Sequence, residues 1–138
     1  MSLTASSTEM AKLYAHAEAG YPHEVVGILA GKRETGELIK VMPLVNERAD
    51  SAHNRYKVSG LILMRAEQSL EAEGHDILGY YHSHPDHPSQ YSDFDREHAL
   101  PNMSYVIVSV LNGTVANTES WRLKEDRSAM DSESIHIF

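Results

Sequence analysis

The pattern of hydrophobic and polar positions along the chain predicts three helices. Apolar residues recur at helical spacing in the segment Ser6–Glu18, where Ser6 and Glu9 have the spacing of a capping box. The same periodicity predicts a second helix from Ser59 to Glu73. A third, short helix is expected around Asp93–Ala99.

Continuous apolar runs predict strands between and after these helices. The runs are EVVGILAG, ELIKVMPLVN, DILGYYHSH and SYVIVSVLNG. Another strand, TVANTESWRL, would follow the pair Asn112-Gly113, which favours a tight hairpin turn. An extended piece is expected at Arg55–Val58, and the terminal SIHIF is expected to add an edge strand. Because strands and helices do not alternate as βαβ units, their order favours an α+β fold.

Composition narrows the class of protein. The 138 residues are enough for one domain with its own core, and we expect a single domain over residues 1–138. The net charge of −8, without a cluster of basic residues, argues against nucleic acid or an anionic membrane as the partner. We find no apolar run of about 20 residues and no secretory signal pattern, so a cytoplasmic protein is expected.

The segment HSHPDHPSQYSDFD, from His82 to Asp95, holds the strongest candidate chemistry. The chain has no cysteine, so a transition-metal site must use histidine with aspartate or glutamate. His82 and His84 stand two residues apart on a predicted strand, so their imidazoles leave the same face. Two histidines and one aspartate would leave a fourth tetrahedral position for water, as in catalytic zinc sites.

The spacing alone leaves the third ligand open. Asp95 is far enough along the chain for the intervening loop to fold back and bring its carboxylate to the histidines. His87 is the alternative ligand, although the prolines on either side of it favour an extended loop with an exposed ring. His98 would lie one turn beyond Asp95, either beside the site or at the surface.

A hydrolytic metal site also needs a base, and Glu24 is the candidate for it. Glutamate often serves as a general base, and a carboxylate at the start of a buried strand calls for an explanation. The glutamate could equally well be a solvent-exposed residue at the end of the strand, after the Tyr21-Pro22 turn, with no role in catalysis. Ser92 has a structural explanation too, because Ser92 and Asp95 have the spacing of a capping box.

Together these residues resemble a known family, the JAMM (MPN-plus) zinc metalloproteases. Its signature is matched by Glu24, then His82-Ser83-His84-Pro85, six further residues, and Ser92-x-x-Asp95. The segments YPHEVVGILAG and ILGYYHSHP resemble the compact prokaryotic branch, and the resemblance covers about residues 10–125. It implies an MPN/JAB (cytidine-deaminase-like) α+β architecture, with a central mixed sheet flanked by helices. Many prokaryotic relatives have cysteine where this chain has Val26.

The resemblance also implies a role for each motif residue. His82, His84 and Asp95 would bind one zinc ion, with a water molecule as the fourth ligand. Glu24 would act as general acid and base, and Ser92 would stabilise the oxyanion. These roles select Asp95 over His87 as the third ligand.

The family cleaves bonds after the C-terminal glycines of ubiquitin-like proteins, and its prokaryotic members act on ubiquitin-like sulfur carriers. The resemblance therefore implies a peptidase or isopeptidase whose partner is the tail of such a carrier. The chain has little room for the insertions with which larger members bind a second ubiquitin, which favours a small leaving group. The alternatives are a zinc amidase for another small substrate and a binding-only MPN module. The oligomeric state is also open, with a homodimer as one alternative.

Overall fold

The computed structural model describes residues 2–46 and 59–138, so the extended piece expected at Arg55–Val58 lies outside the described residues. In chain order the elements are β1 (Ser2–Ala5), α1 (Ser7–Gly20), β2 (Val26–Lys32), β3 (Glu37–Leu44), α2 (Gly60–Ala72), β4 (Asp76–Pro85), α3 (Asp93–His98), β5 (Ser104–Leu111), β6 (Thr114–Leu123) and β7 (Met130–Ile137).

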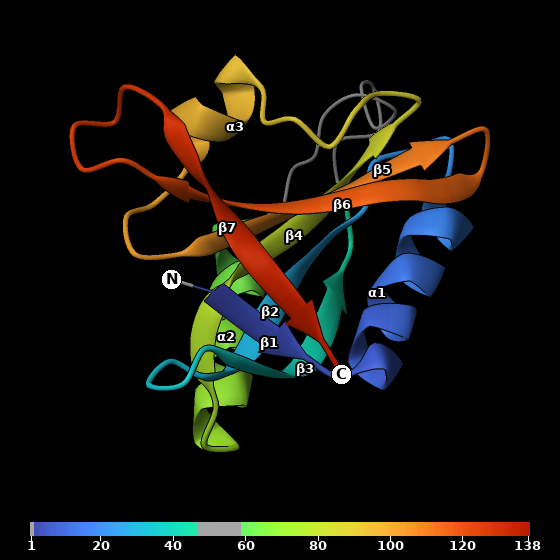
Figure 1. Cartoon of the computed structure of the whole chain (residues 1–138). Coiled ribbons are helices and arrows are strands. Elements are labelled where there is room, and N and C mark those ends of the chain that lie inside the picture. The colour runs from blue at the N-terminus through green and yellow to red at the C-terminus, as the bar shows by residue number, and fades with distance from the viewer. Residues whose placement is uncertain (1, 47–58) are drawn as a thin grey trace.

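The strands form one mixed sheet that closes into a barrel, in the order β1-β3-β2-β4-β5-β6-β7 (Figure 1). β1 runs parallel to both β3 and β7, and β4 runs parallel to β5, whereas the other neighbours are antiparallel. Helices flank this sheet, as the α+β prediction requires. None of the helices in the described ranges is long and apolar enough to cross a membrane.

One face of the central strands β2, β4 and β5 packs against α1. Met10, Leu13 and Ala17 of α1 are buried in a core that includes Tyr81 and Val108. Tyr81 is fully buried, and its hydroxyl contacts His16 Nδ1 of α1 at 2.7 Å. This face of the sheet therefore forms the main core.

The opposite face of the same strands is covered in two parts. Leu70 of α2 packs over Ile28 and Ile77. Farther across the sheet, Tyr105 and Ile107 form a separate cluster with Ala99, Trp121 and Met130, close to the end of α3. A strip of β4 that contains Tyr80, His82 and His84 lies between these two covered parts.

Two predictions about the ends of the chain were incomplete or wrong. β1 was not predicted, because a four-residue strand without flanking turn residues has no distinctive pattern. SIHIF belongs to the longer strand β7, which pairs with β6 on one side and with β1 on the other. It is therefore not an edge strand: the missed strand β1 pairs with it and closes the barrel.

The predicted turn at Asn112-Gly113 is confirmed, whereas the predicted capping box of α1 is only half formed. Both turn residues have positive φ, 52° and 87°, as tight hairpins require. The Ser6 hydroxyl accepts a hydrogen bond from the Glu9 N–H at 3.1 Å. The Glu9 carboxylate instead accepts a hydrogen bond from the Val41 N–H of β3, so it links α1 to the sheet.

Gly79 provides a test of the pairing between β4 and β5. A Cβ atom at Gly79 would lie 1.8 Å from the Ser104 carbonyl oxygen, so the two strands could not keep their spacing. We expect Gly79→Ala to lower the free energy of unfolding by about 1–3 kcal/mol, measured by urea denaturation. The control is Gly60→Ala, because a Cβ there meets no atom within 4 Å and should leave stability equal or slightly higher. Equal stabilities of the two variants would contradict this packing.

Candidate functional site

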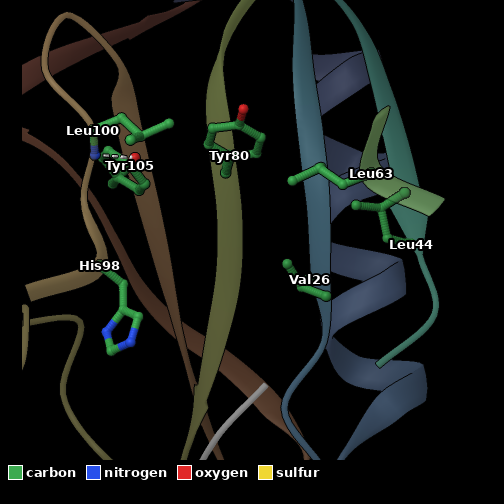
Figure 2. A pocket seen from close by; sticks show the side chains of 7 residues that line it. All are labelled: Val26, Leu44, Leu63, Tyr80, His98, Leu100 and Tyr105. Atoms are coloured by element: carbon green, nitrogen blue, oxygen red, sulfur yellow. Dashed lines mark hydrogen bonds between the residues drawn. The ribbon is translucent and has the colours of Figure 1, made fainter. Parts of the chain in front are cut away.

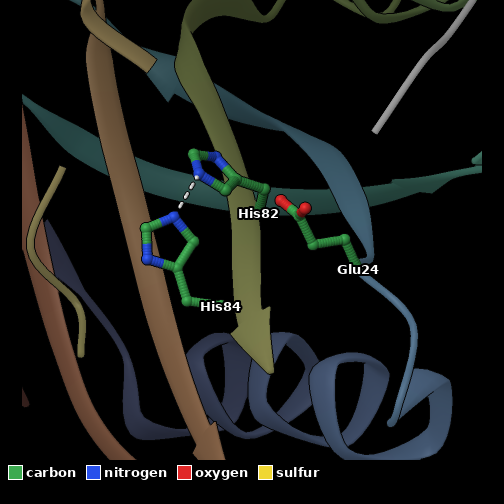
Figure 3. Close-up of side chains that lie close together, drawn as sticks. All are labelled: Glu24, His82 and His84. Atoms are coloured by element: carbon green, nitrogen blue, oxygen red, sulfur yellow. Dashed lines mark hydrogen bonds between the residues drawn. The ribbon is translucent and has the colours of Figure 1, made fainter. Parts of the chain in front are cut away.

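The candidate site lies at the C-terminal end of β4, on the strip between the two covered parts of the sheet. In the sheet register, His82 stands opposite Val26 of β2 on one side and beside Ile107 of β5 on the other. His82 and His84 leave the same face of β4, as their spacing predicts. Their Nε2 atoms approach to 3.3 Å (Figure 3).

Asp95 comes to both histidines from the first turn of α3. Its Oδ1 lies 3.0 Å from His82 Nε2, and its Oδ2 lies 3.2 Å from His84 Nε2. Asp95 is 6% exposed, so this contact is buried. His87, the alternative third ligand, is exposed. The structure thus brings Asp95 into contact with both histidines.

These three side chains suit a tetrahedral metal ion. Zinc binds nitrogen and oxygen ligands at about 2.0–2.1 Å, which places tetrahedral ligands about 3.3 Å from one another. The two Nε2 atoms are 3.3 Å apart, close to this value, and they lie 3.0 and 3.2 Å from the two different oxygens of the Asp95 carboxylate. Two imidazoles and one carboxylate also match the donor preference of zinc. These donor types therefore fit a zinc site in which three side chains would leave one coordination position open.

Hydrogen bonds shift the pKa values of two of the potential ligands, Asp95 and His84. Burial alone would raise the pKa of the Asp95 carboxyl, but the charge of His82 and hydrogen bonds from His82, His84 and the Ser92 N–H hold it well below its usual range. Asp95 is therefore ionised at neutral pH, the state in which carboxylates bind cations. Burial alone would lower the pKa of His84, but hydrogen bonds to Asp95 and to the Pro88 carbonyl raise it.

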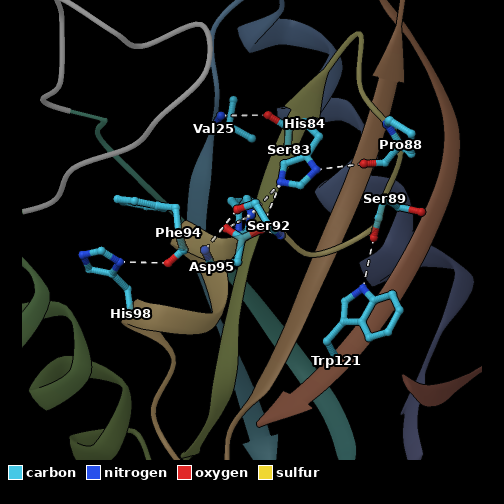
Figure 4. Close-up of polar contacts among 11 residues, drawn as sticks. Val25, Ser83, His84, Pro88, Ser89, Ser92, Phe94, Asp95, His98 and Trp121 are labelled. Atoms are coloured by element: carbon cyan, nitrogen blue, oxygen red, sulfur yellow. Dashed lines mark hydrogen bonds and ion pairs between the residues drawn. The ribbon is translucent and has the colours of Figure 1, made fainter. Parts of the chain in front are cut away.

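The Pro88 carbonyl also orients the ring of His84. It lies 2.8 Å from His84 Nδ1 (Figure 4). A carbonyl oxygen only accepts hydrogen bonds, so Nδ1 donates in this contact, and the other ring nitrogen, Nε2, faces His82 and Asp95. Backbone carbonyls often orient metal-binding histidines in this way.

Glu24 lies two residues before the first residue of β2 and is 5% exposed. One carboxylate oxygen of Glu24 and one ring nitrogen of each histidine lie within 4.8 Å of one another (Figure 3). The Glu24 carbonyl accepts a hydrogen bond from Asn46 Nδ2 at 2.9 Å. Glu24 is therefore buried beside the histidines, and the alternative of a solvated residue at a strand end is wrong.

Ser83 holds Glu24 in this position, a role that the sequence analysis did not assign. Ser83 is fully buried, and its hydroxyl accepts a hydrogen bond from the Val25 N–H at 2.9 Å (Figure 4). The Ser83 N–H donates in turn to the Val25 carbonyl at 3.1 Å. The signal was present in the sequence, because a residue between His82 and His84 must point to the opposite face of the strand.

Ser92 combines a structural role with an exposed hydroxyl group. It caps α3 in a complete capping box: its Oγ accepts from the Asp95 N–H at 3.1 Å, and its N–H donates to Asp95 Oδ2 at 2.9 Å. This interaction uses Oγ as an acceptor only, so the hydroxyl hydrogen can still be donated. Ser92 is exposed and lines a cavity together with Glu24 and His84.

Two cavities flank the histidines. The first has a volume of about 330 Å³ and is lined by Glu24, His84, Pro85, His87, Pro88, Gln90, Tyr91 and Ser92. The second has a volume of about 200 Å³ and is lined by Val26, Leu44, Leu63, Tyr80, His98, Leu100 and Tyr105 (Figure 2). Tyr80, in the second cavity, and His84, in the first, lie on opposite sides of His82 along β4, so His82 lies between the two cavities.

His98 belongs to the second cavity. Its ring stacks on Phe94 with centroids 4.1 Å apart, and its Nδ1 contacts the Phe94 carbonyl at 2.8 Å (Figure 4). The Tyr105 hydroxyl, in the same cavity, accepts a hydrogen bond from the Leu100 N–H. These rings give a mostly apolar cavity a small number of polar atoms.

Comparison with known proteins agrees with this geometry. A family described as prokaryotic homologs of the JAB domain matches residues 7–124. A probable TtuB-protein conjugate cleaving protease from Thermus thermophilus is 39% identical over 93 residues, which are 67% of this chain and 60% of that protein. A desampylase from Haloferax volcanii is 31% identical over 114 residues, which are 79% of this chain and 80% of that protein.

Solved structures agree as well. The solution structure of a protein from Desulfitobacterium hafniense has a TM-score of 0.83 at 27% identity and covers 99% of this chain and 92% of that one. A JAB1/MPN domain protein from Archaeoglobus fulgidus has a TM-score of 0.62 at 16% identity, with 98% of both chains covered, which shows a shared fold. The expected MPN/JAB architecture is therefore confirmed, and the chain belongs to the family of prokaryotic homologs of the JAB domain.

Proposed function

We propose that this protein is a zinc-dependent peptidase that hydrolyses the amide bond after the C-terminal Gly-Gly of a ubiquitin-like or sulfur-carrier protein. The observation that carries the proposal is a buried carboxylate, Glu24, beside His82 and His84, two potential ligands that also contact Asp95. Relatives named as a TtuB-conjugate cleaving protease and a desampylase support cleavage of protein conjugates.

In the proposed reaction Glu24 carries out both proton transfers. When bound by His82, His84 and Asp95, zinc supplies a Lewis acid that polarises the scissile carbonyl and lowers the pKa of a water molecule to about 7. Glu24 accepts a proton from that water as its oxygen bonds to the carbonyl carbon. The same carboxyl group then gives the proton to the amine nitrogen as the C–N bond breaks. The products are a carboxyl terminus and a free amine.

Ser92 is proposed to stabilise the oxygen of the reacting carbonyl. Its hydroxyl hydrogen is not used by the helix cap, and the side chain lines the same cavity as Glu24 and His84. Removal of such a donor in other hydrolases costs about 3–4 kcal/mol of transition-state stabilisation. The capping box orients Ser92, so the donor needs little rearrangement during the reaction.

The two cavities support an extended substrate that crosses the histidines. The mostly apolar cavity around Leu63 and Tyr80 suits an apolar side chain of the carrier tail, upstream of the two glycines. The cavity around Ser92 and Tyr91 suits the leaving group. Glycines between the two cavities would let the tail backbone approach the buried histidines closely, because they carry no side chain.

The proposed ligands can be tested by zinc binding. We expect one zinc ion per chain, and we expect Asp95→Asn to weaken the affinity by more than about 100-fold, because loss of a ligand should exceed the loss of a supporting residue. Competition with a chromophoric chelator measures the affinity.

His87→Ala is the matched control for this experiment. His87 is the alternative third ligand and lies in the same loop, but its side chain is exposed. The variant should bind zinc as the wild type does. The assignment would be wrong if His87→Ala lost zinc and Asp95→Asn kept it.

The proposed activity can be tested with conjugates. The zinc-loaded protein is incubated with ubiquitin-like and sulfur-carrier conjugates from the same genome, and mass spectrometry locates the cut. We expect cleavage directly after the terminal Gly-Gly. Glu24→Gln should bind zinc normally and lose about 10²–10⁴-fold in turnover, because the amide cannot carry the proton.

Each other outcome supports a different conclusion. Substantial turnover by Glu24→Gln would contradict the role of Glu24 as the base. A zinc-loaded wild-type protein that cuts other small amides and no conjugate would be an amidase. A zinc-loaded wild-type protein that binds the carrier tail without cutting it would be a binding module.

The apolar cavity can be tested separately by placing a charge in it. We expect Leu63→Glu to raise KM for a carrier conjugate by about tenfold with little change in kcat, because an apolar contact of about 1.5 kcal/mol is lost. Leu61→Glu is the control, since Leu61 lies on the same helix with 52% of its surface exposed. Steady-state kinetics compare the two. Equal effects would mean that the charge of α2, and not the cavity, governs KM.

A further inference from the structure

The loop between β4 and α3 is fixed at three consecutive carbonyl groups. The His87 carbonyl accepts a hydrogen bond from Ser109 Oγ of β5 at 2.6 Å. The Pro88 carbonyl lies 2.8 Å from His84 Nδ1 of β4, and the Ser89 carbonyl accepts from Trp121 Nε1 of β6 at 3.0 Å (Figure 4). Side chains of three neighbouring strands thus bind one short segment of the loop.

The Ser89 side chain adds to this attachment. It is 1% exposed, its hydroxyl donates to Glu119 Oε2 at 2.8 Å, and the same oxygen accepts from Asn117 Nδ2 at 3.0 Å. Trp121 is also buried, and its ring makes an edge contact with Tyr91 of the loop at a centroid distance of 5.0 Å. The hydrogen-bonding capacity of Ser89 is therefore used on both its backbone and its side chain.

These contacts lie on the same face of the sheet as the histidines. In the register, His84 stands beside Ser109, and Ser109 stands opposite Asn117. Trp121 lies on β6 two pleats from Asn117 and pairs with Tyr105, which lines the apolar cavity. One continuous surface thus holds both His84 and the loop that binds it.

We infer that Ser109, Ser89 and Trp121 are positioning residues for His84. They fix the carbonyl groups on either side of Pro88 and so hold the Pro88 carbonyl where it accepts a hydrogen bond from His84 Nδ1, with Nε2 directed at His82 and Asp95. The inference rests on the proposed function only in that His84 Nε2 is taken as a metal ligand.

The physical reason is that an imidazole binds a metal through one nitrogen and keeps its N–H on the other. With Nε2 facing His82 and Asp95, the Nδ1–H needs an acceptor in a fixed position, and the Pro88 carbonyl is that acceptor. Pro88 has no N–H of its own, so the segment cannot be held at that residue by a backbone donor. The carbonyls on either side of Pro88 hold this part of the loop instead, and supporting residues of this kind typically change metal affinity by about 10–100-fold.

Two variants and one control test the inference. Trp121→Phe removes the indole N–H and keeps an aromatic ring, and Ser109→Ala removes the hydroxyl that binds the His87 carbonyl. Ser120→Ala is the control: Ser120 is 1% exposed and its hydroxyl donates to Glu133 Oε1 at 2.8 Å, so a similar buried hydrogen bond is lost. Ser120 neighbours Trp121 on β6 but points to the opposite face of the strand.

Three measurements are made on each protein. Proton-exchange measurements in ¹H–¹⁵N spectra of the zinc-loaded protein report the hydrogen bond of His84 Nδ1–H, chelator competition gives the zinc affinity, and thermal denaturation gives the stability. In the wild type we expect the Nδ1–H proton to be protected from exchange with water by its hydrogen bond to the Pro88 carbonyl. Trp121→Phe and Ser109→Ala should exchange this proton faster and bind zinc about tenfold more weakly. Ser120→Ala should lose stability and keep both the protection and the affinity of the wild type.

The outcomes separate this inference from the proposed function. It is overturned if both variants keep the protection of the Nδ1–H proton and wild-type zinc affinity, or if Ser120→Ala changes them equally. A wild-type protein that binds zinc but cleaves no conjugate would remove the proposed function, while faster exchange and weaker zinc binding in the variants would still support the inference. Conversely, active variants with unchanged protection and affinity would remove only the positioning roles.

Discussion

Two hydrogen bonds between Val25 and Ser83 hold together the parts of the chain on which the site depends. Val25 and Ser83 are 58 positions apart, yet each residue is both donor and acceptor toward the other. The pair aligns β2 with β4, so that Glu24 lies beside His82. A slip of one residue in β4 would turn both histidines toward the core, because side chains alternate along a strand. The position of the base and the orientation of the potential ligands therefore depend on the same register.

The buried cluster of His82, His84 and Asp95 is stable because its polar groups bind one another. His82 and Asp95 are almost entirely buried, and an isolated charge in such a place would be strongly unfavourable. Here the carboxylate receives hydrogen bonds from two imidazoles and from a backbone N–H at the start of a helix. The favourable electrostatics of this cluster are specific to its geometry, and a rearrangement of one member would leave the others without partners.

The sequence predicted the local features of the site better than its long-range contacts. The shared face of His82 and His84 and the hairpin at Asn112-Gly113 follow from short-range geometry, and both appear in the structure. The choice between Asp95 and His87 could not be made from spacing, because it depends on how the loop folds. That loop is held by side chains of β5 and β6, which lie later in the chain.

The errors have the same origin. The Glu9 carboxylate was expected to return to the start of its own helix, but the N–H of Val41 offers a tertiary partner that the local pattern does not reveal. β1 was missed, and SIHIF was taken for an edge strand, because parallel pairing between the two ends of the chain leaves no turn signal. The family resemblance supplied the missing long-range information for Asp95, but it gave Ser83 no role.

Asp95 joins two parts of the site. Its carboxylate completes the capping box of α3 and also contacts both histidines. If Asp95 binds the proposed cation, formation of the first turn of α3 and cation binding are thermodynamically linked: whatever free energy the turn adds to cation binding, the cation adds to the turn. Ser92 belongs to that turn, so the order of the group proposed to bind the substrate oxygen would depend on the cation. Through one shared side chain, metal binding and preparation for the substrate would then be coupled.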